Sequence, residues 1–388
     1  MKFHDPPVLP RGFRCASRNV GLKQSAKDLA LFVSDVDAAA AAVFTRSRFP
    51  GAPVTLGRET IKAGRLRAIV ANSKCSNVAT GLQGLENARR MASAAAAEIG
   101  STADRVLVSS TGVIGVQLPV ELIETGIRGM AADLQADPFV GAEGIMTTDT
   151  HPKAISTSVG SATITWVAKG SGMIEPNMAT MLAYIFTDAA FEAATLDKML
   201  REAVHVSFNM LSVDTDTSTS DTCAILANGH AGSVDAGSFR GALNAGSIRM
   251  TEILARDGEG ATHLLRATVR GAKSEDDARR VAKALVNSPL IKTMVQGADP
   301  NVGRILMAVG KCVDCAMRPD ATEAWINGHA VVRSGARLAF DEATVRAALA
   351  AEQVDIEVAL GAGDASATAY GCDLTTGYIE ENAAYYSS

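Results

Sequence analysis

Two patterns of apolar residues recur along this chain of 388 residues. Short aliphatic runs, and runs that alternate apolar with polar residues, are typical of strands. They occur at 27–33, 68–71, 106–110, 161–168, 181–186, 223–227 and 263–269, and a strand end followed by a loop is expected in 145–152. Longer segments with helical spacing predict helices at 83–99, 119–135, 196–208, 243–255, 275–286 and 342–352. This intermixing predicts a mixed α/β (α+β) fold. Residues 1–26 are polar and contain three prolines, so we expect an irregular arm there.

The segment 169–184 connects the strand predicted at 161–168 to the next apolar run. Gly170 and Gly172 permit a positive φ and a close approach of other backbone, and Pro176 disfavours a long helix. Thr180 is therefore expected at the end of a constrained loop, where an apolar element starts. By itself, the spacing fits an ordinary loop threonine equally well, because a Gly-x-Gly turn is a weak signal.

Composition limits the class of protein. Hydrophobic residues make up 47% of the chain and aromatic residues 5%, so we expect a core of Ala, Val, Leu and Ile. The length suits two or three domain-sized units or one large α/β body. A net charge of -5 gives no electrostatic reason to bind nucleic acid or an anionic membrane. No apolar run is long enough to span a membrane and the N-terminus has no apolar signal core, so we expect a cytoplasmic protein.

Cysteine, histidine and acidic residues give no metal signature. The six cysteines are scattered, which favours reduced thiols over a disulfide scaffold. Cys312 and Cys315 form a lone C-x-x-C pair, whereas zinc needs four ligands. The histidines lack paired spacing, and the polar run 214–221 lacks the glycine and glutamate of a calcium loop. We expect no bound metal and interpret 214–221 as a hydrogen-bonding loop.

The string Lys169-Gly-Ser-Gly-Met-Ile-Glu-Pro-Asn-Met-Ala-Thr-Met-Leu resembles the self-cleavage segment of the ornithine acetyltransferases, also called glutamate N-acetyltransferases. Ser-Ser-Thr-Gly-Val-Ile-Gly at 109–115, Asn-Ser-Pro-Leu-Ile-Lys at 287–292 and Asp-Pro-Asn-x-Gly-Arg at 299–304 are similar to strings of the same family. The resemblance covers nearly the whole chain. Val302 stands where a Trp is usual, and Asn-Ser-Lys-Cys-Ser-Asn at 72–77 replaces a glycine- and asparagine-rich loop. The string 44–49 is closer to the variant of clavulanic acid gene clusters.

The resemblance implies that the chain cuts itself between Ala179 and Thr180. The products would be an α chain, 1–179, and a β chain, 180–388, that stay associated, as a dimer of αβ units. The implied architecture is the mixed α/β self-processing fold of ArgJ-like and DmpA-like proteins. The chemistry suits Thr180, because a threonine hydroxyl needs a base, and the α-amine of an N-terminal threonine has a pKa near neutrality. No metal or organic cofactor is required.

The resemblance also implies the other site residues. Thr111 would contribute its hydroxyl and Gly112 its N–H to an oxyanion hole. Lys169, Thr147, Glu259, Asn382 and Ser387 would align the amino-acid substrate, with Glu259 receiving the side-chain amine. Each has a plainer interpretation without the resemblance. Positions 110–112 would be a strand-to-helix turn, Lys169 a solvated lysine, Glu259 part of an exposed turn, and the last residues a frayed tail.

The expected reaction is ping-pong transfer of an acetyl group from N2-acetylornithine, or a similar N-acetyl amino acid, to glutamate through an ester on Thr180. Three alternatives remain. The chain could acetylate a specialised amino acid of secondary metabolism, or be an N-terminal-nucleophile amidase or aminopeptidase that passes the acyl group to water, or be a binding protein without activity. The sequence does not decide which amine is preferred or whether acetyl-CoA is also a donor.

Overall fold

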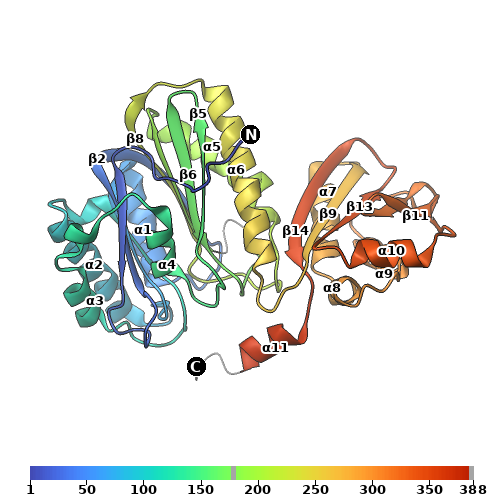
Figure 1. The fold of residues 1–388 in the computed structure, drawn as a ribbon, viewed down its shortest axis with the longest axis horizontal. Helices are drawn as coiled ribbons and strands as arrows, with labels where there is room; N and C mark the ends of the chain where they lie inside the picture. The colour runs from blue at the N-terminus through green and yellow to red at the C-terminus, as the bar shows by residue number, and fades with distance from the viewer. Residues whose placement is uncertain (176–180, 384–388) are drawn as a thin grey trace. The chain divides into compact units, whose positions relative to one another are not determined.

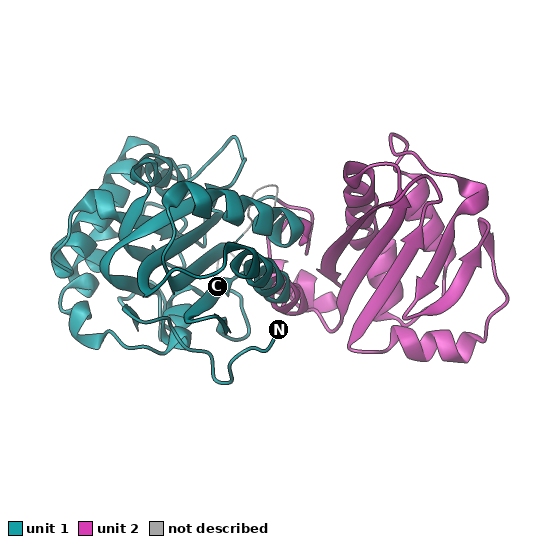
Figure 2. Ribbon diagram, turned by 90° about the horizontal axis from the view of Figure 1, so that it is seen from above, with its two compact units in different colours: residues 1–170, 176–209, 217–250 teal, residues 171–175, 210–216, 251–388 magenta. Residues whose placement is uncertain are grey.

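The computed structural model describes residues 1–175 and 181–383, and the contacts among them define two units (Figure 2). Of the described residues, unit 1 contains 1–170, 181–209 and 217–250, and unit 2 contains 171–175, 210–216 and 251–383. Each unit has its own sheet and is described by itself. Strands and helices alternate in both, which confirms the predicted mixed α/β class.

The sheet of unit 1 has eight strands and is built around β2 (Leu29–Phe44), whose length gives it three partners (Figure 1). The first half of β2 pairs with β1 and β3, and its second half pairs with β8. The order along the main path is β4-β3-β2-β8-β7-β6-β5. The other strands are β1 (Phe13–Arg18), β3 (Arg65–Asn72), β4 (Val106–Ser110), β5 (Lys153–Val159), β6 (Ala162–Lys169), β7 (Leu182–Ala189) and β8 (Thr222–Gly232).

Both faces of β2 are buried, because successive side chains point to opposite faces. Ala30 and Phe32 belong to one apolar cluster, with residues of β6, β7 and β8. Leu29 and Leu31 belong to the other, which includes the apolar face of α2. These clusters consist mainly of Ala, Val, Leu and Ile, as the composition predicts.

The helices of unit 1 pack against this sheet or against one another, with α2 on β3 and β4, α4 on β1 and β2, α5 on β2, and α3 on α2 (Figure 1). They are α1 (Ala52–Thr60), α2 (Gly81–Glu98), α3 (Val120–Ile127), α4 (Pro138–Ile145), α5 (Ala193–Val206) and α6 (Ala236–Arg256), whose last residues belong to unit 2. Short 3-10 turns lie at η1 (Ile61–Ala63), η2 (Ala103–Arg105), η3 (Met130–Asp133) and η4 (Phe208–Met210).

Unit 2 has a six-stranded sheet in the order β12-β11-β10-β13-β9-β14, with α7 packed on β9 and β14. Its strands are β9 (Leu264–Ala272), β10 (Glu323–Ile326), β11 (His329–Arg333), β12 (Ala336–Arg337), β13 (Gln353–Ala359) and β14 (Ala365–Cys372). Its helices are α7 (Glu275–Val286), α8 (Pro289–Gln296), α9 (Gly303–Gly310), α10 (Glu342–Leu349) and α11 (Thr376–Ala383), with η5 (Pro319–Ala321).

Three sequence expectations were wrong. The arm 1–26 contains β1, which is held by pairing with β2 and by the Phe13 ring, 5.2 Å from that of Phe186. Where a strand end was expected in 145–152, α4 ends at Ile145 and a loop follows. This helix begins at Pro138 and is capped by the Asp137 side chain. The helix expected over 119–135 ends at Ile127, because Gly129 adopts a left-handed φ of 72° and only a 3-10 turn follows.

Candidate active site

Thr111 and Gly112 directly follow β4, and the end of the neighbouring strand β3 holds them in place. The Thr111 N–H donates to the carbonyl of Asn72 (3.0 Å), and the Ser110 hydroxyl donates to the Asn72 side-chain oxygen (2.6 Å). Gly112 has a φ of 126°, and a Cβ there would lie 2.2 Å from the carbonyl carbon of Lys74. Only glycine fits this conformation and this approach.

The donors assigned to the oxyanion hole are not used by the surrounding structure. The N–H groups on either side of Gly112 are paired, that of Thr111 with Asn72 and that of Val113 with Lys74. Within residues 1–175 and 181–383, neither the Gly112 N–H nor the Thr111 hydroxyl has a hydrogen-bond partner. Both donors therefore remain available to a bound group, as an oxyanion hole would require.

Lys169 and Thr147 also come together in unit 1. Lys169 is the last residue of β6, and its Nζ donates to the Thr147 hydroxyl at 2.9 Å. Lys169 is 8% exposed, so it is not the solvated lysine of the plainer interpretation. The Thr147 N–H donates to Asp149, whose other carboxylate oxygen accepts from the N–H of Gly170. One carboxylate thus fixes the backbone beside both residues.

The surroundings of Lys169 contain further cations. Lys23 donates from Nζ to the carbonyl of Met146 (2.7 Å), the residue before Thr147. Burial lowers the pKa of Lys23 to about 8, and repulsion from Lys169 and Lys74 acts in the same direction, against attraction from Asp28 and Asp149. An anionic group brought to Lys169 would reduce this repulsion.

Glu259 and Asn382 come together in unit 2, although 123 positions separate them. The Asn382 side-chain amide donates to a Glu259 carboxylate oxygen (2.6 Å) and to the carbonyl of Tyr378 (2.9 Å). The Glu259 N–H donates to the carbonyl of Ser171, and a Cβ on Gly172 would lie 2.2 Å from the carboxylate. The absence of a Cβ at Gly172 therefore gives the Glu259 carboxylate room to approach.

The start of the run 214–221 is a hydrogen-bonding element, as expected. The Asp214 carboxylate accepts from the N–H groups of Met173 and Ile174 (2.6 and 2.7 Å), which fixes the loop that leads towards Thr180. Burial raises the pKa of Asp214 above its ordinary value despite these hydrogen bonds. No group of three or more potential metal ligands occurs in the described part of the chain.

Asp221, at the other end of this run, was not predicted as a site residue. It is fully buried, and burial raises its pKa well above the ordinary value, whereas hydrogen bonds from Ser218 and Thr45 and the charge of Lys169 act to lower it. It precedes Thr222, whose N–H donates to the carbonyl of Met181. Asn72 and Asp149 were also missed as supports of the site. The sequence signal that could have identified these residues is a polar residue next to a buried strand.

Three predicted residues, Ala179, Thr180 and Ser387, lie outside the described residues. Around the predicted cut, the described chain ends at Glu175 and resumes at Met181. Lys169 of β6 is the cross-strand neighbour of Leu182 of β7, and Leu182 is the neighbour of Thr222 of β8. The sheet thus aligns Lys169 with the residue that is two positions after Thr180.

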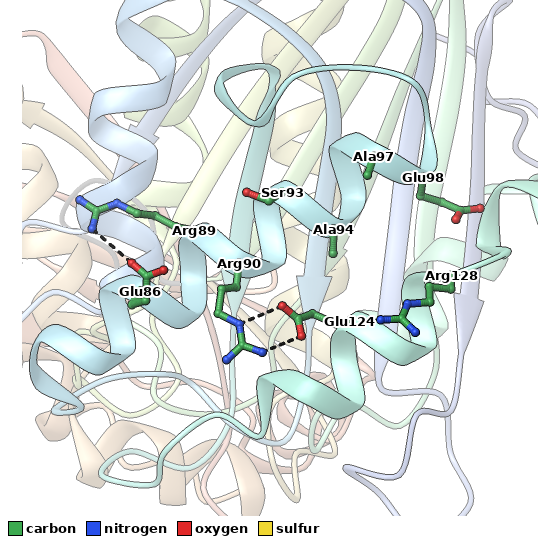
Figure 3. A pocket seen from close by; sticks show the side chains of 9 residues that line it. All are labelled: Glu86, Arg89, Arg90, Ser93, Ala94, Ala97, Glu98, Glu124 and Arg128. Atoms are coloured by element: carbon green, nitrogen blue, oxygen red, sulfur yellow. Dashed lines mark hydrogen bonds and ion pairs between the residues drawn. The ribbon is translucent and has the colours of Figure 1, made fainter.

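A cavity of about 530 Å³ on α2 and α3 contains none of the predicted residues (Figure 3). In this cavity Arg90 is paired with Glu124 and Glu121, and Arg89 with Glu86. None of the helices described in 1–175 and 181–383 has both the length and the apolar character needed to cross a membrane.

Comparisons with known proteins identify close relatives. A family model described as "ArgJ family" matches residues 14–387. "Arginine biosynthesis bifunctional protein ArgJ 2" of Nostoc sp. is 44% identical over 390 residues, covering 97% of each chain. "Glutamate N-acetyltransferase Oat2" of Streptomyces clavuligerus is 43% identical over 387 residues, covering 98% of each chain. The crystal structure of "Arginine biosynthesis bifunctional protein argJ" from Bacillus halodurans matches with a TM-score of 0.51 and 35% identity, over 52% of this chain and 98% of that chain.

Proposed function

Because this chain belongs to the ArgJ family, we propose that it transfers an acetyl group from N2-acetylornithine to glutamate through an ester on Thr180. The names of its relatives place the family among the N-acetyltransferases of arginine biosynthesis, and the chain is an acyltransferase of this kind. The family predicted from the sequence is thereby confirmed.

The proposed mechanism begins with self-cleavage between Ala179 and Thr180. The Thr180 hydroxyl attacks the preceding carbonyl in an N-to-O acyl shift, and water hydrolyses the resulting ester. The nitrogen of Thr180, an amide in the intact chain, becomes a free α-amine that can act as a base near neutral pH. The matched Bacillus halodurans chain supports two-chain maturation, because it is only about half as long as this chain.

The two product chains, 1–179 and 180–388, are proposed to stay together. The cut would separate β6 from β7 in the sequence, yet these strands are paired from Ile164 to Lys169. It would also separate β2 from β8, which are paired over six residues of β2. Unit 1 thus draws strands of one sheet from both chains, which supports their lasting association; a dimer of such αβ units remains our prediction.

In the transfer, the Thr180 hydroxyl attacks the acetyl carbonyl carbon of N2-acetylornithine, and its α-amine accepts the proton. The Thr111 hydroxyl and the Gly112 N–H stabilise the oxyanion, and the ornithine amine leaves with the proton. Glutamate then attacks the acetyl ester with its amine, and Thr180 is regenerated. No metal or organic cofactor takes part in these steps.

The substrate contacts are proposed from the chemistry of each group. Lys169 and Thr147 provide a cation and a hydroxyl suited to an α-carboxylate, and Glu259, hydrogen-bonded by Asn382, provides a carboxylate suited to the side-chain ammonium. Ser387 would add a hydroxyl. The observation that carries the proposal is the pair of donors after β4, the Thr111 hydroxyl and the Gly112 N–H, which no other described residue engages and which an oxyanion would need.

One incubation tests the reaction. The purified protein is given N2-acetylornithine with and without glutamate, and free ornithine and N-acetylglutamate are measured. We expect ornithine release that depends on glutamate, with one N-acetylglutamate formed per ornithine. Fast release without glutamate would instead support the amidase or aminopeptidase. No release from N2-acetylornithine, with transfer from another N-acetyl amino acid, would support the specialised acetyltransferase.

A further inference from the structure

The carboxylate of Asp149 accepts hydrogen bonds from its own loop, from the start of β5 and from the turn after β6. Its Oδ1 accepts from the Lys153 ammonium at 2.6 Å and from the N–H of Gly170 at 2.7 Å, and its Oδ2 accepts from the N–H of Thr147 at 2.9 Å. Lys153 is the first residue of β5 and lies opposite Ala168 of β6, one residue before Lys169. The loop containing Thr147, the start of β5 and the turn after β6 are therefore fixed to one side chain.

The Asp149–Lys153 pair is fully buried, since both side chains are 0% exposed. Burial by itself would raise the pKa of Asp149, but attraction from Lys153 and Lys169 and the hydrogen bonds from Lys153 and Thr147 outweigh it and hold the pKa at about 2. Burying two charges costs free energy that their attraction repays only in good geometry. A buried pair is thus weak evidence for stability and calls for another explanation.

The atoms held by Asp149 flank the two groups proposed to bind the substrate carboxylate. Lys169 precedes Gly170, and Thr147 donates its own N–H to Asp149, so the distance of 2.9 Å between Lys169 Nζ and Thr147 Oγ1 depends on this carboxylate. The Thr147 hydroxyl accepts from Lys169, which leaves its own proton to donate to an anion. Lys153 cancels the charge of Asp149, which would otherwise repel an anionic substrate at Lys169.

We propose that Asp149, with its charge neutralised by Lys153, is the positioning residue that makes the Lys169–Thr147 pair selective for a free α-carboxylate. This inference rests on the proposed function, because it assigns a substrate group to that site. Asp149 does not touch the reacting atoms. It acts by fixing the spacing of a cation and a hydroxyl, which a carboxylate can engage with two oxygens at once and a carboxamide cannot.

The test compares N2-acetylornithine with its α-carboxamide in the processed enzyme. Asp149→Asn alone leaves Lys153 buried without its counter-charge and is expected to fold poorly. The informative protein is the double variant Asp149→Asn with Lys153→Met, which removes both charges at similar volume. We expect its preference for the carboxylate substrate, measured as the ratio of the two kcat/KM values, to fall by about tenfold or more. The loss should lie mainly in KM for the carboxylate.

Asp188→Asn provides the matched control. Asp188 is also a buried carboxylate of unit 1 that accepts from a backbone N–H, that of Thr163, and from Arg11, but at the opposite end of the β6–β7 pair. Its substitution should leave the preference unchanged. The rate measured with each substrate is divided by the fraction of chain that is cleaved. A folding defect then lowers the rates with both substrates by the same factor and leaves their ratio unchanged. A double variant that is folded and cleaved and keeps the wild-type preference would overturn the inference, whereas a wild-type enzyme without acetyl transfer would overturn the proposed function itself.

Discussion

The Asn382 amide donates a hydrogen bond to the Glu259 carboxylate, with 2.6 Å between Nδ2 and Oε2. The bond joins α11, near the end of the chain, to a Gly-Glu-Gly turn after α6. Asn382 also donates to the carbonyl of Tyr378, one helical turn earlier, so its amide is oriented from its own helix. Asn382 thus fixes the orientation of the Glu259 carboxylate.

Glu259→Gln should weaken recognition of a donor that carries a side-chain ammonium. The substitution keeps the size but removes the charge, and a hydrogen bond to a charged group is worth about 1.5–3 kcal/mol, or roughly ten- to a hundredfold in affinity. We expect KM for N2-acetylornithine to rise by about this factor, and KM for an N-acetyl amino acid with an uncharged side chain to change little. An equal change in KM for both acetyl donors would contradict the proposal that Glu259 binds the side-chain ammonium. Glu352→Gln, at a carboxylate 84% exposed, is the control.

Thr111→Val should lower kcat by about a hundred- to a thousandfold, because one oxyanion donor is lost, while KM changes little. Valine has the shape of threonine, and the Thr111 hydroxyl makes no hydrogen bond in the described structure whose loss would disturb the fold. Thr111→Ser keeps the hydroxyl and should retain most of the activity. The test is to measure kcat and KM of the wild type, Thr111→Val and Thr111→Ser. A Thr111→Val enzyme with the wild-type kcat would show that the Thr111 hydroxyl does not stabilise the oxyanion.

Gly172→Ala should affect substrate binding more than stability. The new Cβ would lie 2.2 Å from the Glu259 carboxylate, which is the flexible end of a side chain and can move away. Moving it breaks its hydrogen bond with Asn382, so KM for N2-acetylornithine should rise while the melting temperature changes by only a few degrees.

Gly241→Ala is the matched control for this change, because Gly241 is a glycine of α6 with open space around its Cβ position. Alanine there should stabilise the protein by about 0.5–1 kcal/mol and leave KM unchanged. If Gly172→Ala behaved in the same way, Glu259 would not depend on the close approach that the structure shows.

Acid should destabilise the wild type through Asp149. Its pKa is about 2 in the folded protein and its ordinary value is 3.8, so the unfolded chain binds a proton first as the pH falls. The contribution is fully present above pH 4, is lost as the pH falls towards 2, and amounts to about 2 kcal/mol. Urea unfolding at pH 5 and pH 2 should show a loss larger by that amount in the wild type than in Asp149→Asn with Lys153→Met. Equal losses in both proteins would contradict the lowered pKa.

The strands that carry the site could be predicted from the sequence, because local apolar runs specify them. The strand predicted at 161–168 is β6, and that at 106–110 is β4, which delivers Thr111 and Gly112. The helix predicted over 275–286 is α7 with the same bounds. These elements have clear local patterns, and burial reinforces the local preference.

The features that could not be predicted depend on contacts between distant positions. Strand β1 follows three prolines and is stabilised by pairing with β2, which no local pattern shows. The segment Ser-Asp-Val-Asp at 34–37 looks like a break, yet β2 continues through it with an irregular register against β3. No role could be predicted for Asp149, because its contact with Gly170, 21 positions later, forms only in the folded sheet.

The central claim is that a peptide bond opens to make Thr180 the first residue of a second chain. The direct measurement is N-terminal sequencing and intact mass of the purified active protein, before and after incubation with N2-acetylornithine, beside the Thr180→Ala protein. We predict two chains, one beginning Thr-Met-Leu-Ala and gaining the mass of one acetyl group with substrate, and a single uncut chain for Thr180→Ala. Active wild-type protein that consists only of the uncut chain beginning at Met1 would contradict the account.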